Sequence, residues 1–314
     1  MISQIRQLHV RNYKSIGEVN VSLEPLTVFV GPNGSGKSNV LDALAFVQES
    51  LATTVELALK NRGGIGAVRR RSGGRPTHIG INLALDLEDG ASAEYGFIIA
   101  AKPKERFRVA HERCCVKKLG EKDQVFELRN GEFRKKMPGV RAKVAFDRLG
   151  FSAACVLGEF RPVYDFLSRA RFYSIIPDQL RQLQEPDPGE FLKRDGSNAA
   201  AVLKRLGEDE QGGERYACLC QTLAKIAPGL QRVEYRAVGQ KETLRFRQDI
   251  ELKRSCPFDA LNMSDGTLRI LALLLAVYQI DGASLVAIEE PGAIVYPASA
   301  EIVMRVLMET AAQR

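Results

Sequence analysis

The stretch from Gly31 to Asn39 carries residue types that together hold a nucleotide phosphate. It has the form Gly-x-x-x-x-Gly-Lys-Ser, and its residues are Gly31, Pro32, Asn33, Gly34, Ser35, Gly36, Lys37, Ser38 and Asn39. Glycines let backbone N–H groups turn toward a phosphate, and the N-terminus of a following helix favours its negative charge. In such a P-loop the lysine reaches the β- and γ-phosphate oxygens, and the serine hydroxyl ligates Mg²⁺. The stretch predicts a nucleotide-phosphate cradle, and the alternative is a glycine-rich turn that binds nothing.

A P-loop needs a strand before it and a helix after it. The apolar run Leu26–Val30 predicts the strand, and apolar residues at helical spacing predict a helix over about 38–60, ended by Asn61-Arg62-Gly63-Gly64. Alternation of apolar and polar residues predicts two earlier strands, over Ile2–Val10 and Val19–Leu23.

A second candidate stretch lies before an apolar helix predicted over Leu268–Gln279. Ser264, Asp265 and Gly266 precede this helix, and its apolar residues lie on nearly every face. A buried helix with Ser264 as its N-cap accounts for the pattern structurally. The functional alternative is a loop whose serine and glycine contact a phosphate.

A third candidate stretch is the apolar strand predicted over Ser284–Ile288, which ends in Glu289 and Glu290. Carboxylates at the C-terminal edge of a parallel strand beside a P-loop can hold the water shell of a metal and polarise an attacking water. The plainer alternative is an exposed pair of glutamates at a strand end.

The middle of the chain supplies the remaining elements. Residues 77–130 have a pattern of short strands, with strict alternation from Ile79 to Leu87, and predict an antiparallel meander with one solvated face. Residues 131–230 are predicted to be mainly helical, with a strand over Phe172–Ile176 and a turn at Asp195-Gly196-Ser197-Asn198 that supplies a Ser or Asn N-cap. Strand alternation returns after residue 230, over Val233–Val238 and Thr243–Ile250.

The order of these motifs resembles that of the SMC/RecF/OLD-like ATPases, including their AAA15 and AAA_21-type members, which are built on the ABC-type head. Leu8–Ser15, followed by a strand and then the P-loop flanked by Asn33 and Asn39, is similar to the N-terminus of that group. Met263–Thr267 resembles the ABC signature loop, and Ser284–Pro291 resembles a Walker B strand.

The resemblance implies an α/β fold with an ABC-ATPase-like P-loop core, an antiparallel β meander and a helical lid subdomain. The corresponding domains are the N-terminal part of the core, the β subdomain, the helical subdomain and the C-terminal part of the core, at residues 1–76, 77–130, 131–230 and 231–314.

The resemblance also implies the roles of the site residues. ATP and Mg²⁺ would be the cofactors, with Ser38 and Glu289 at the metal. Glu290 would be the general base, with Lys37 as the second catalytic residue. The signature residues Ser264, Asp265 and Gly266 would contact the ATP bound by a second copy, so that two copies associate as an ATP-sandwich dimer.

Two departures from the family pattern bear on turnover. Relatives in the OLD-like group commonly continue the Walker B with an acidic residue and a histidine, where this chain has Gly292 and Tyr296. No histidine follows His111, so the final strand and switch histidine of such heads are not expected before Arg314. Slow hydrolysis, pieces supplied by a partner and a truncated chain remain open alternatives. Long coiled-coil arms and a C-terminal Toprim nuclease are not expected in this polypeptide.

Composition limits the partners and the compartment. The net charge is +7, and basic residues cluster around Arg69–Arg71 with Arg75, around Lys102–Arg108, at Arg113, Lys117 and Lys118, and around Arg134–Lys143. This clustering favours a nucleic acid partner over the alternative of a solvated basic face.

The longest apolar run, Ile270–Val277, is far shorter than a membrane span, and the N-terminus has no signal-peptide core. Six cysteines without metal-site spacing favour reduced thiols over a zinc site. A cytoplasmic protein without a membrane partner is expected.

Three functional hypotheses follow. The first is an ATPase that dimerises around ATP and switches an assembly acting on nucleic acid, together with a separate nuclease or effector subunit, as in DNA repair or phage defence. The second is a regulatory or scaffolding module that binds ATP and hydrolyses it poorly. The third, a transporter ATPase, is disfavoured because the signature is not Leu-Ser-Gly-Gly-Gln.

Overall fold

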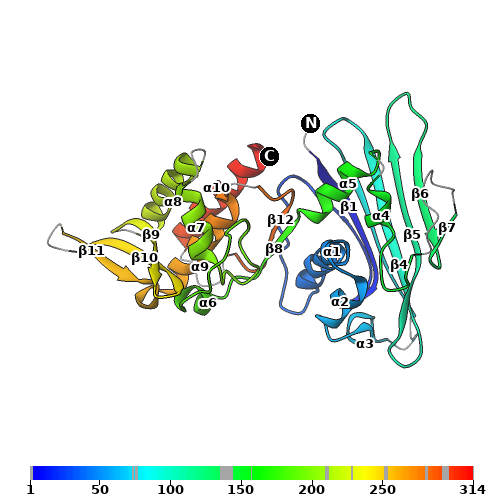
Figure 1. Cartoon of the computed structure of the whole chain (residues 1–314), viewed down its shortest axis with the longest axis horizontal. Helices are drawn as coiled ribbons and strands as arrows, with labels where there is room; N and C mark the ends of the chain where they lie inside the picture. The colour runs from blue at the N-terminus through cyan, green and yellow to red at the C-terminus, as the bar shows by residue number, and fades with distance from the viewer. Residues whose placement is uncertain are drawn as a thin grey trace. The chain divides into compact units, whose positions relative to one another are not determined.

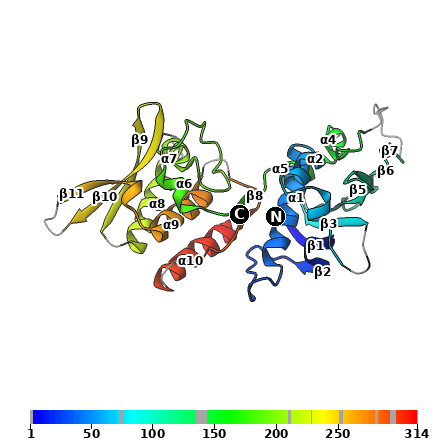
Figure 2. The ribbon, with the colours of Figure 1, turned by 90° about the horizontal axis from the view of Figure 1, so that it is seen from below.

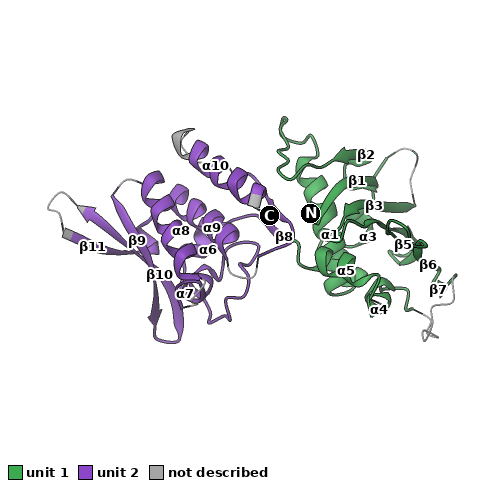
Figure 3. Ribbon diagram, turned by 90° about the horizontal axis from the view of Figure 1, so that it is seen from above, with its two compact units in different colours: residues 1–170 green, residues 171–314 purple. Residues whose placement is uncertain are grey.

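The chain forms two compact units, one of residues 1–170 and one of residues 171–314, which are coloured separately in Figure 3. The computed structural model describes residues 3–72, 74, 77–134, 144–156, 158–208, 212–227, 229–250, 254–279, 282–291 and 297–313. Each unit has its own secondary structure and is described by itself.

Unit 1 is built on one antiparallel sheet of seven strands, in the order β2-β1-β3-β4-β5-β6-β7. The strands are β1 (Gln4–Tyr13), β2 (Ile16–Ser22), β3 (His78–Asp86), β4 (Ser92–Ala101), β5 (Phe107–Lys117), β6 (Gln124–Arg129) and β7 (Glu132–Phe133). The meander predicted over residues 77–130 is confirmed. It is extended at one edge by the first two strands of the chain, because β1 pairs with both β2 and β3.

The helices of unit 1 cover one face of this sheet (Figures 1 and 2). They are α1 (Lys37–Ala52), α2 (Val55–Lys60), α3 (Ile65–Val68), α4 (Phe151–Ala154) and α5 (Arg161–Ser168). Strict alternation along β3 places Ile79, Ile81, Leu83 and Leu85 in the core at 3% exposure or less.

The helix predicted over about 38–60 is two helices. Thr53 leaves the helical conformation with φ −129° and ψ −108°, which ends α1. Thr54 then begins α2, and its hydroxyl accepts a hydrogen bond from the Leu57 amide at 3.0 Å. Threonine is favoured at the N-cap, where its hydroxyl accepts from a backbone amide of the first turn. The pair Thr53-Thr54 therefore ends one helix and starts the next.

The strand predicted over Leu26–Val30 is wrong. Within the described part of unit 1, these residues pair with no other strand, and Val28 and Val30 are 58% and 89% exposed. The Thr27 hydroxyl bonds instead to the backbone of Glu24, accepting from its amide at 2.9 Å. Apolar residues alone do not make a strand, because the ladder needs a neighbour to accept and donate its hydrogen bonds.

Unit 2 places two small sheets around a set of helices. Its strands are β8 (Arg171–Tyr173), β9 (Leu230–Val238), β10 (Lys241–Ile250), β11 (Arg254–Asp259) and β12 (Val286–Ile288). Its helices are α6 (Pro177–Arg181), α7 (Ala199–Glu208), α8 (Gly212–Ile226), the 3₁₀ turn η1 (Ala260–Asn262), α9 (Asp265–Tyr278) and α10 (Pro297–Gln313). The antiparallel sheet β11-β10-β9 packs against α7 and α8, and β12 pairs with β8 in parallel (Figures 1 and 2).

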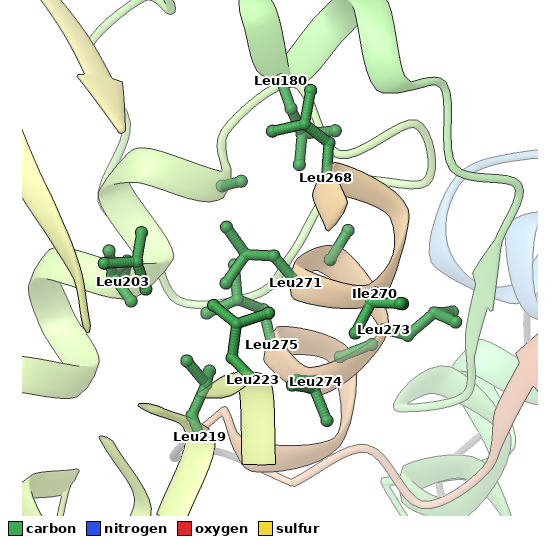
Figure 4. Packing of buried hydrophobic residues seen from close by; sticks show 14 of the residues in the cluster. Leu180, Leu203, Leu219, Leu223, Leu268, Ile270, Leu271, Leu273, Leu274 and Leu275 are labelled. Carbon is green, nitrogen blue, oxygen red and sulfur yellow. The ribbon is translucent and has the colours of Figure 1, made fainter. Parts of the chain in front are cut away.

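Helix α9 lies in the core of unit 2. Leu268, Leu271 and Leu275 are fully buried, together with side chains from α6, α7 and α8 (Figure 4). This confirms the buried helix predicted over Leu268–Gln279. Among the helices that the structure describes, none is both long enough and apolar enough to cross a membrane.

A buried carboxylate joins the sheet of unit 1 to the segment that follows it. Glu112 on β5 is fully buried and accepts hydrogen bonds from the Tyr95 hydroxyl at 2.9 Å and from the Gly150 and Phe151 amides at 2.6 and 3.2 Å. These amides lie at the N-terminus of α4. Burial outweighs the three donors and raises the pKa of Glu112 to about 7.

We expect Glu112→Ala to lower the free energy of unfolding of unit 1 by about 3 kcal/mol, because it leaves buried donors unpaired and opens a cavity. Urea denaturation followed by circular dichroism measures the change, and hydrogen exchange of β4 and β5 peptides assigns it to unit 1. Glu121→Ala, on an exposed turn, is the control and should change stability by less than about 0.5 kcal/mol.

The same residue predicts a pH dependence. Because the pKa of Glu112 lies near 7 in the fold and at its lower ordinary value in the unfolded chain, the fold holds an extra proton between these values. Stability should therefore fall as pH rises through this interval, by at most about 1.4 kcal/mol per pH unit. Glu112→Gln should flatten that slope, and an unchanged slope would contradict the assignment.

Candidate functional site

The P-loop has the backbone shape of a phosphate cradle. Gly34 and Gly36 have φ values of 78° and 96°, in the region that favours glycine, and Gly36 is the residue before α1. The Lys37 ammonium donates to the carbonyl oxygens of Gly31 at 2.7 Å and Pro32 at 2.9 Å. The lysine thus lies across the loop at the N-terminus of a helix of 16 residues.

These residues fit a nucleotide phosphate and a metal. Residues 31–35 are exposed, and an ammonium that donates to two carbonyls retains a third proton for a phosphate oxygen. A side chain at Gly31 would place Cβ 3.2 Å from the Ser35 hydroxyl oxygen. Ser38 is exposed in the first turn of α1 and offers the hard oxygen that Mg²⁺ prefers.

The turn between β1 and β2 holds the start of α1. The Asn39 side chain donates to the Ser15 hydroxyl at 2.7 Å. Lys14, in the same turn, has a φ of 48°, which is uncommon for a residue with a side chain. Its amide donates to the carbonyl of Val68, the last residue of α3, at 2.6 Å, so the end of that helix also supports the turn.

Asp42 fixes α1 to this turn from inside the unit. Its carboxylate accepts from the Tyr13 hydroxyl at 2.6 Å, pairs with Lys14 at 2.6 Å and accepts from Arg62 at 3.0 Å. The Asp42 and Arg62 side chains are only 10% and 7% exposed, and Arg62 also pairs with Glu49. Burial favours the neutral acid, but hydrogen bonds from Lys14 and Tyr13 and the charge of Arg62 hold the pKa of Asp42 below its usual value.

The candidate signature loop, Met263–Thr267, lies at the N-terminus of α9. The Ser264 hydroxyl accepts from the Thr267 amide at 3.2 Å, and the Leu268 amide donates to the Ser264 carbonyl at 3.1 Å. The predicted N-cap is confirmed. Asp265 is the first residue of the helix, and its carboxylate contacts Arg181 of α6.

The apolar strand predicted over Ser284–Ile288, the candidate Walker B strand, corresponds to β12, which pairs with β8 in parallel. The Glu289 amide donates to the Tyr173 carbonyl at 2.8 Å, so the ladder continues one residue past the strand. The Glu289 carboxylate lies 3.5 Å from the guanidinium of Arg194. Glu290 is exposed and has a φ of 48°, a strained conformation of the kind found at functional sites.

One segment of unit 2 contacts both candidate motifs. Residues 174–198, between β8 and α7, carry Arg181, which contacts Asp265 of the candidate signature loop, and Arg194, which contacts Glu289 of the candidate Walker B strand. At the other end of α9, Gln279 accepts from the Leu192 amide at 3.0 Å and donates to the Tyr173 hydroxyl at 2.9 Å. The signature helix is therefore held at both ends by β8 and the segment that follows it.

The predicted site residues divide between the units. Residues 31–39 lie in unit 1, and Ser264–Gly266, Glu289 and Glu290 lie in unit 2. Gly292 and Tyr296, which depart from the family pattern, lie outside the described residues. Among the described residues, no group of three or more His, Cys, Asp or Glu side chains forms a candidate metal site.

Sequence reasoning missed Asp42, Arg181 and Arg194. Asp42 had a signal, since it is an acidic residue between apolar positions of the helix after the P-loop. The two arginines carry no local signal, because their partners are distant in the sequence.

Curated proteins align with parts of the chain. It is 26% identical over 253 residues to the chromosome partition protein Smc of Methanocaldococcus jannaschii, an alignment that covers 74% of this chain and 20% of Smc. It is 40% identical over 43 residues to the OLD nuclease of Thermus scotoductus, covering 14% of this chain and 8% of the nuclease. It is 37% identical over 62 residues to RecF of Corynebacterium jeikeium, covering 19% of this chain and 15% of RecF. The chain thus spans one fifth or less of each of these relatives.

Solved structures share the fold. The SMC head bound to the C-winged helix domain of ScpA superimposes with a TM-score of 0.59 at 15% identity, covering 98% of this chain and 87% of that one. The Smc head with an extended coiled coil, bound to the C-terminal domain of ScpA from Pyrococcus furiosus, gives 0.53 at 14% identity, covering 99% and 88%. At these identities the likeness shows the fold alone.

Fold and motifs together define an SMC/RecF/OLD-like ATPase head, as the resemblance implied. The family profile AAA_21, described as "AAA domain, putative AbiEii toxin, Type IV TA system", matches residues 26–144 and 165–314. The chain belongs to this family.

We expect Asp42→Ala to destabilise unit 1 by about 3 kcal/mol, because it leaves the buried Arg62 without one of its carboxylates. The contribution of Asp42 is present above its ordinary pKa of 3.8 and is lost as pH falls through its lower pKa in the fold. Urea denaturation at several pH values measures both effects. Asp86→Ala, which removes the partner of an exposed arginine, should cost less than about 1 kcal/mol, and equal losses would contradict the role of Asp42.

Proposed function

We propose that this chain is an ATP-hydrolysing head that dimerises around ATP and switches an assembly acting on nucleic acid. The observation that carries the proposal is the P-loop, where two left-handed glycines and Lys37 form a cradle at the N-terminus of α1. Membership of an ATPase family supports ATP as the nucleotide.

The roles of the residues follow from their chemistry. Lys37 binds β- and γ-phosphate oxygens, and Ser38 and Glu289 provide oxygen ligands for Mg²⁺, which neutralises phosphate charge when bound. Glu290 accepts a proton from the attacking water. Ser264 and Gly266, at the N-terminus of α9, contact the γ-phosphate of ATP held by a second copy.

Nucleic acid is the partner that the charge supports best. Lys102, Lys104 and Arg106 lie exposed on the β4–β5 hairpin, and among the described residues the structure shows no ion pair for them. Lys117 and Lys118, by contrast, pair with Glu94 and Asp89. Unpaired cations are the ones that gain most from a phosphate backbone. A separate nuclease or effector subunit, in DNA repair or phage defence, completes the proposed assembly.

The first test is phosphate release by the full chain with Mg²⁺ and ATP. We expect Lys37→Ala and Glu290→Gln each to lower the rate by about 100-fold or more, because they remove a phosphate ligand and the general base. Light scattering should show that Glu290→Gln retains the ATP-dependent increase in mass and that Lys37→Ala loses it. Lys60→Ala, an exposed lysine at the end of α2, is the matched control and should behave as the wild type.

If the wild-type chain binds ATP and associates but releases no phosphate, the hypothesis of an ATP-hydrolysing head is refuted and that of an ATP-binding regulatory module is favoured. A chain that binds no nucleotide would overturn the proposal altogether.

The second test measures binding to duplex DNA at several salt concentrations. Replacing Lys102, Lys104 and Arg106 by alanine should weaken binding and reduce the slope of log K against log salt by up to about 3, one counterion for each lost phosphate contact. Alanine at Lys117 and Lys118 is the matched control, since these lysines already have carboxylate partners. Equal binding by the hairpin variant and the wild type would refute this contact surface.

A further inference from the structure

Arg181 contacts the signature loop on both sides of its serine. Its Nη2 atom donates to the carbonyl oxygen of Met263 at 3.1 Å and to the carboxylate of Asp265. Its Nη1 atom donates to Asp178 at 2.5 Å. One guanidinium therefore fixes the residue before Ser264 and the residue after it.

The backbone that carries Arg181 is itself held in the core. Leu180 is fully buried and lies beside Leu268 of the signature helix (Figure 4). Gly196, with a φ of 86°, makes room for it, because a Cβ there would lie 2.6 Å from Leu180 Cδ1. The Arg181 side chain is only 20% exposed. Its position relative to the loop is thus set by packing and not by the ion pair alone.

Asp265 poses an electrostatic problem at a phosphate-binding loop. Its carboxylate is 44% exposed and follows directly after the serine proposed to meet the γ-phosphate. A triphosphate is strongly anionic, so a bare carboxylate beside it would oppose association through Coulomb repulsion. Arg181 contributes the opposite charge at hydrogen-bond distance from that carboxylate.

We propose that Arg181 is a positioning residue of the composite ATP site, which holds the Met263–Asp265 loop and neutralises Asp265 so that the loop accepts the triphosphate carried by a second copy. This inference rests on the ATP-dependent dimerisation proposed above. In this proposal Arg181 and Asp265 affect the association of two copies, and they do not affect the binding of ATP to the P-loop of a single copy.

The test is a double-mutant cycle in the full chain carrying Glu290→Gln, with the dimer dissociation constant in Mg²⁺-ATP measured by analytical ultracentrifugation. We expect Arg181→Ala to weaken the dimer by about tenfold or more, since it leaves a carboxylate uncompensated at the interface. Asp265→Asn should change it by less than about threefold. The double variant Arg181→Ala/Asp265→Asn should recover to within about threefold of Asp265→Asn, because the repulsive charge is gone.

Three further measurements separate charge from folding. Arg181→Lys should fall between the parent and Arg181→Ala, because lysine keeps the charge but loses the guanidinium geometry. Arg305→Ala, which removes an exposed ion-paired arginine on α10, should have no effect on the dimer. The affinity of each variant for a fluorescent ATP analogue under conditions where it is monomeric should equal that of the parent.

The outcomes distinguish the two proposals. If the Glu290→Gln parent shows no ATP-dependent dimer, the proposed function fails. If the parent dimerises and Arg181→Ala dimerises equally well, the inference about Arg181 is overturned while the proposed function stands. A double variant as weak as Arg181→Ala alone also overturns it, because neutralisation of Asp265 would then not be what Arg181 supplies.

Discussion

The P-loop region depends on the buried carboxylate of Asp42. An ionised group with so little exposure is stable only if its oxygens are saturated by donors. Here the donors come from two separate places, the β1–β2 turn with Tyr13 and Lys14, and the loop after α2 with Arg62. Movement of α1 away from either would leave a buried charge unpaired. The helix that begins the phosphate cradle is therefore fixed by electrostatics inside the unit, while the cradle itself stays open to solvent.

In unit 2 the central helix α9 is apolar on nearly every side and has to be held in one orientation. Hydrophobic packing keeps α9 in the core but is non-directional, so it does not set the rotation of the helix or the position of its ends. Polar contacts at the two ends of α9 fix its rotation and the position of its ends. Ser264 and Arg181 order the N-terminal end, and Gln279, with 2% exposure, bonds to Leu192 and Tyr173 at the other.

The sequence predicts features that depend on local pattern, and it fails where distant partners decide. Strict alternation along residues 79–87 suffices for a meander strand, because one face meets the core and the other meets water. The run Leu26–Val30 is also apolar, yet it pairs with no described strand of unit 1. Likewise the P-loop and the candidate signature and Walker B stretches can be recognised as short motifs. Arg181 is 84 residues from Asp265, and no local pattern could have paired them.

The two candidate motifs of unit 2 share an arrangement that argues against chance. Glu289 and Asp265 belong to different elements, and each carboxylate meets an arginine from the same segment, residues 174–198. The Ser174 amide donates to the Arg194 carbonyl at 2.9 Å, and Tyr173, one residue earlier, accepts the Glu289 amide. The segment is therefore registered on the Walker B strand by backbone bonds and on the signature helix by Leu180. Both counter-charges are therefore carried by one connected piece of chain, which contacts both candidate motifs.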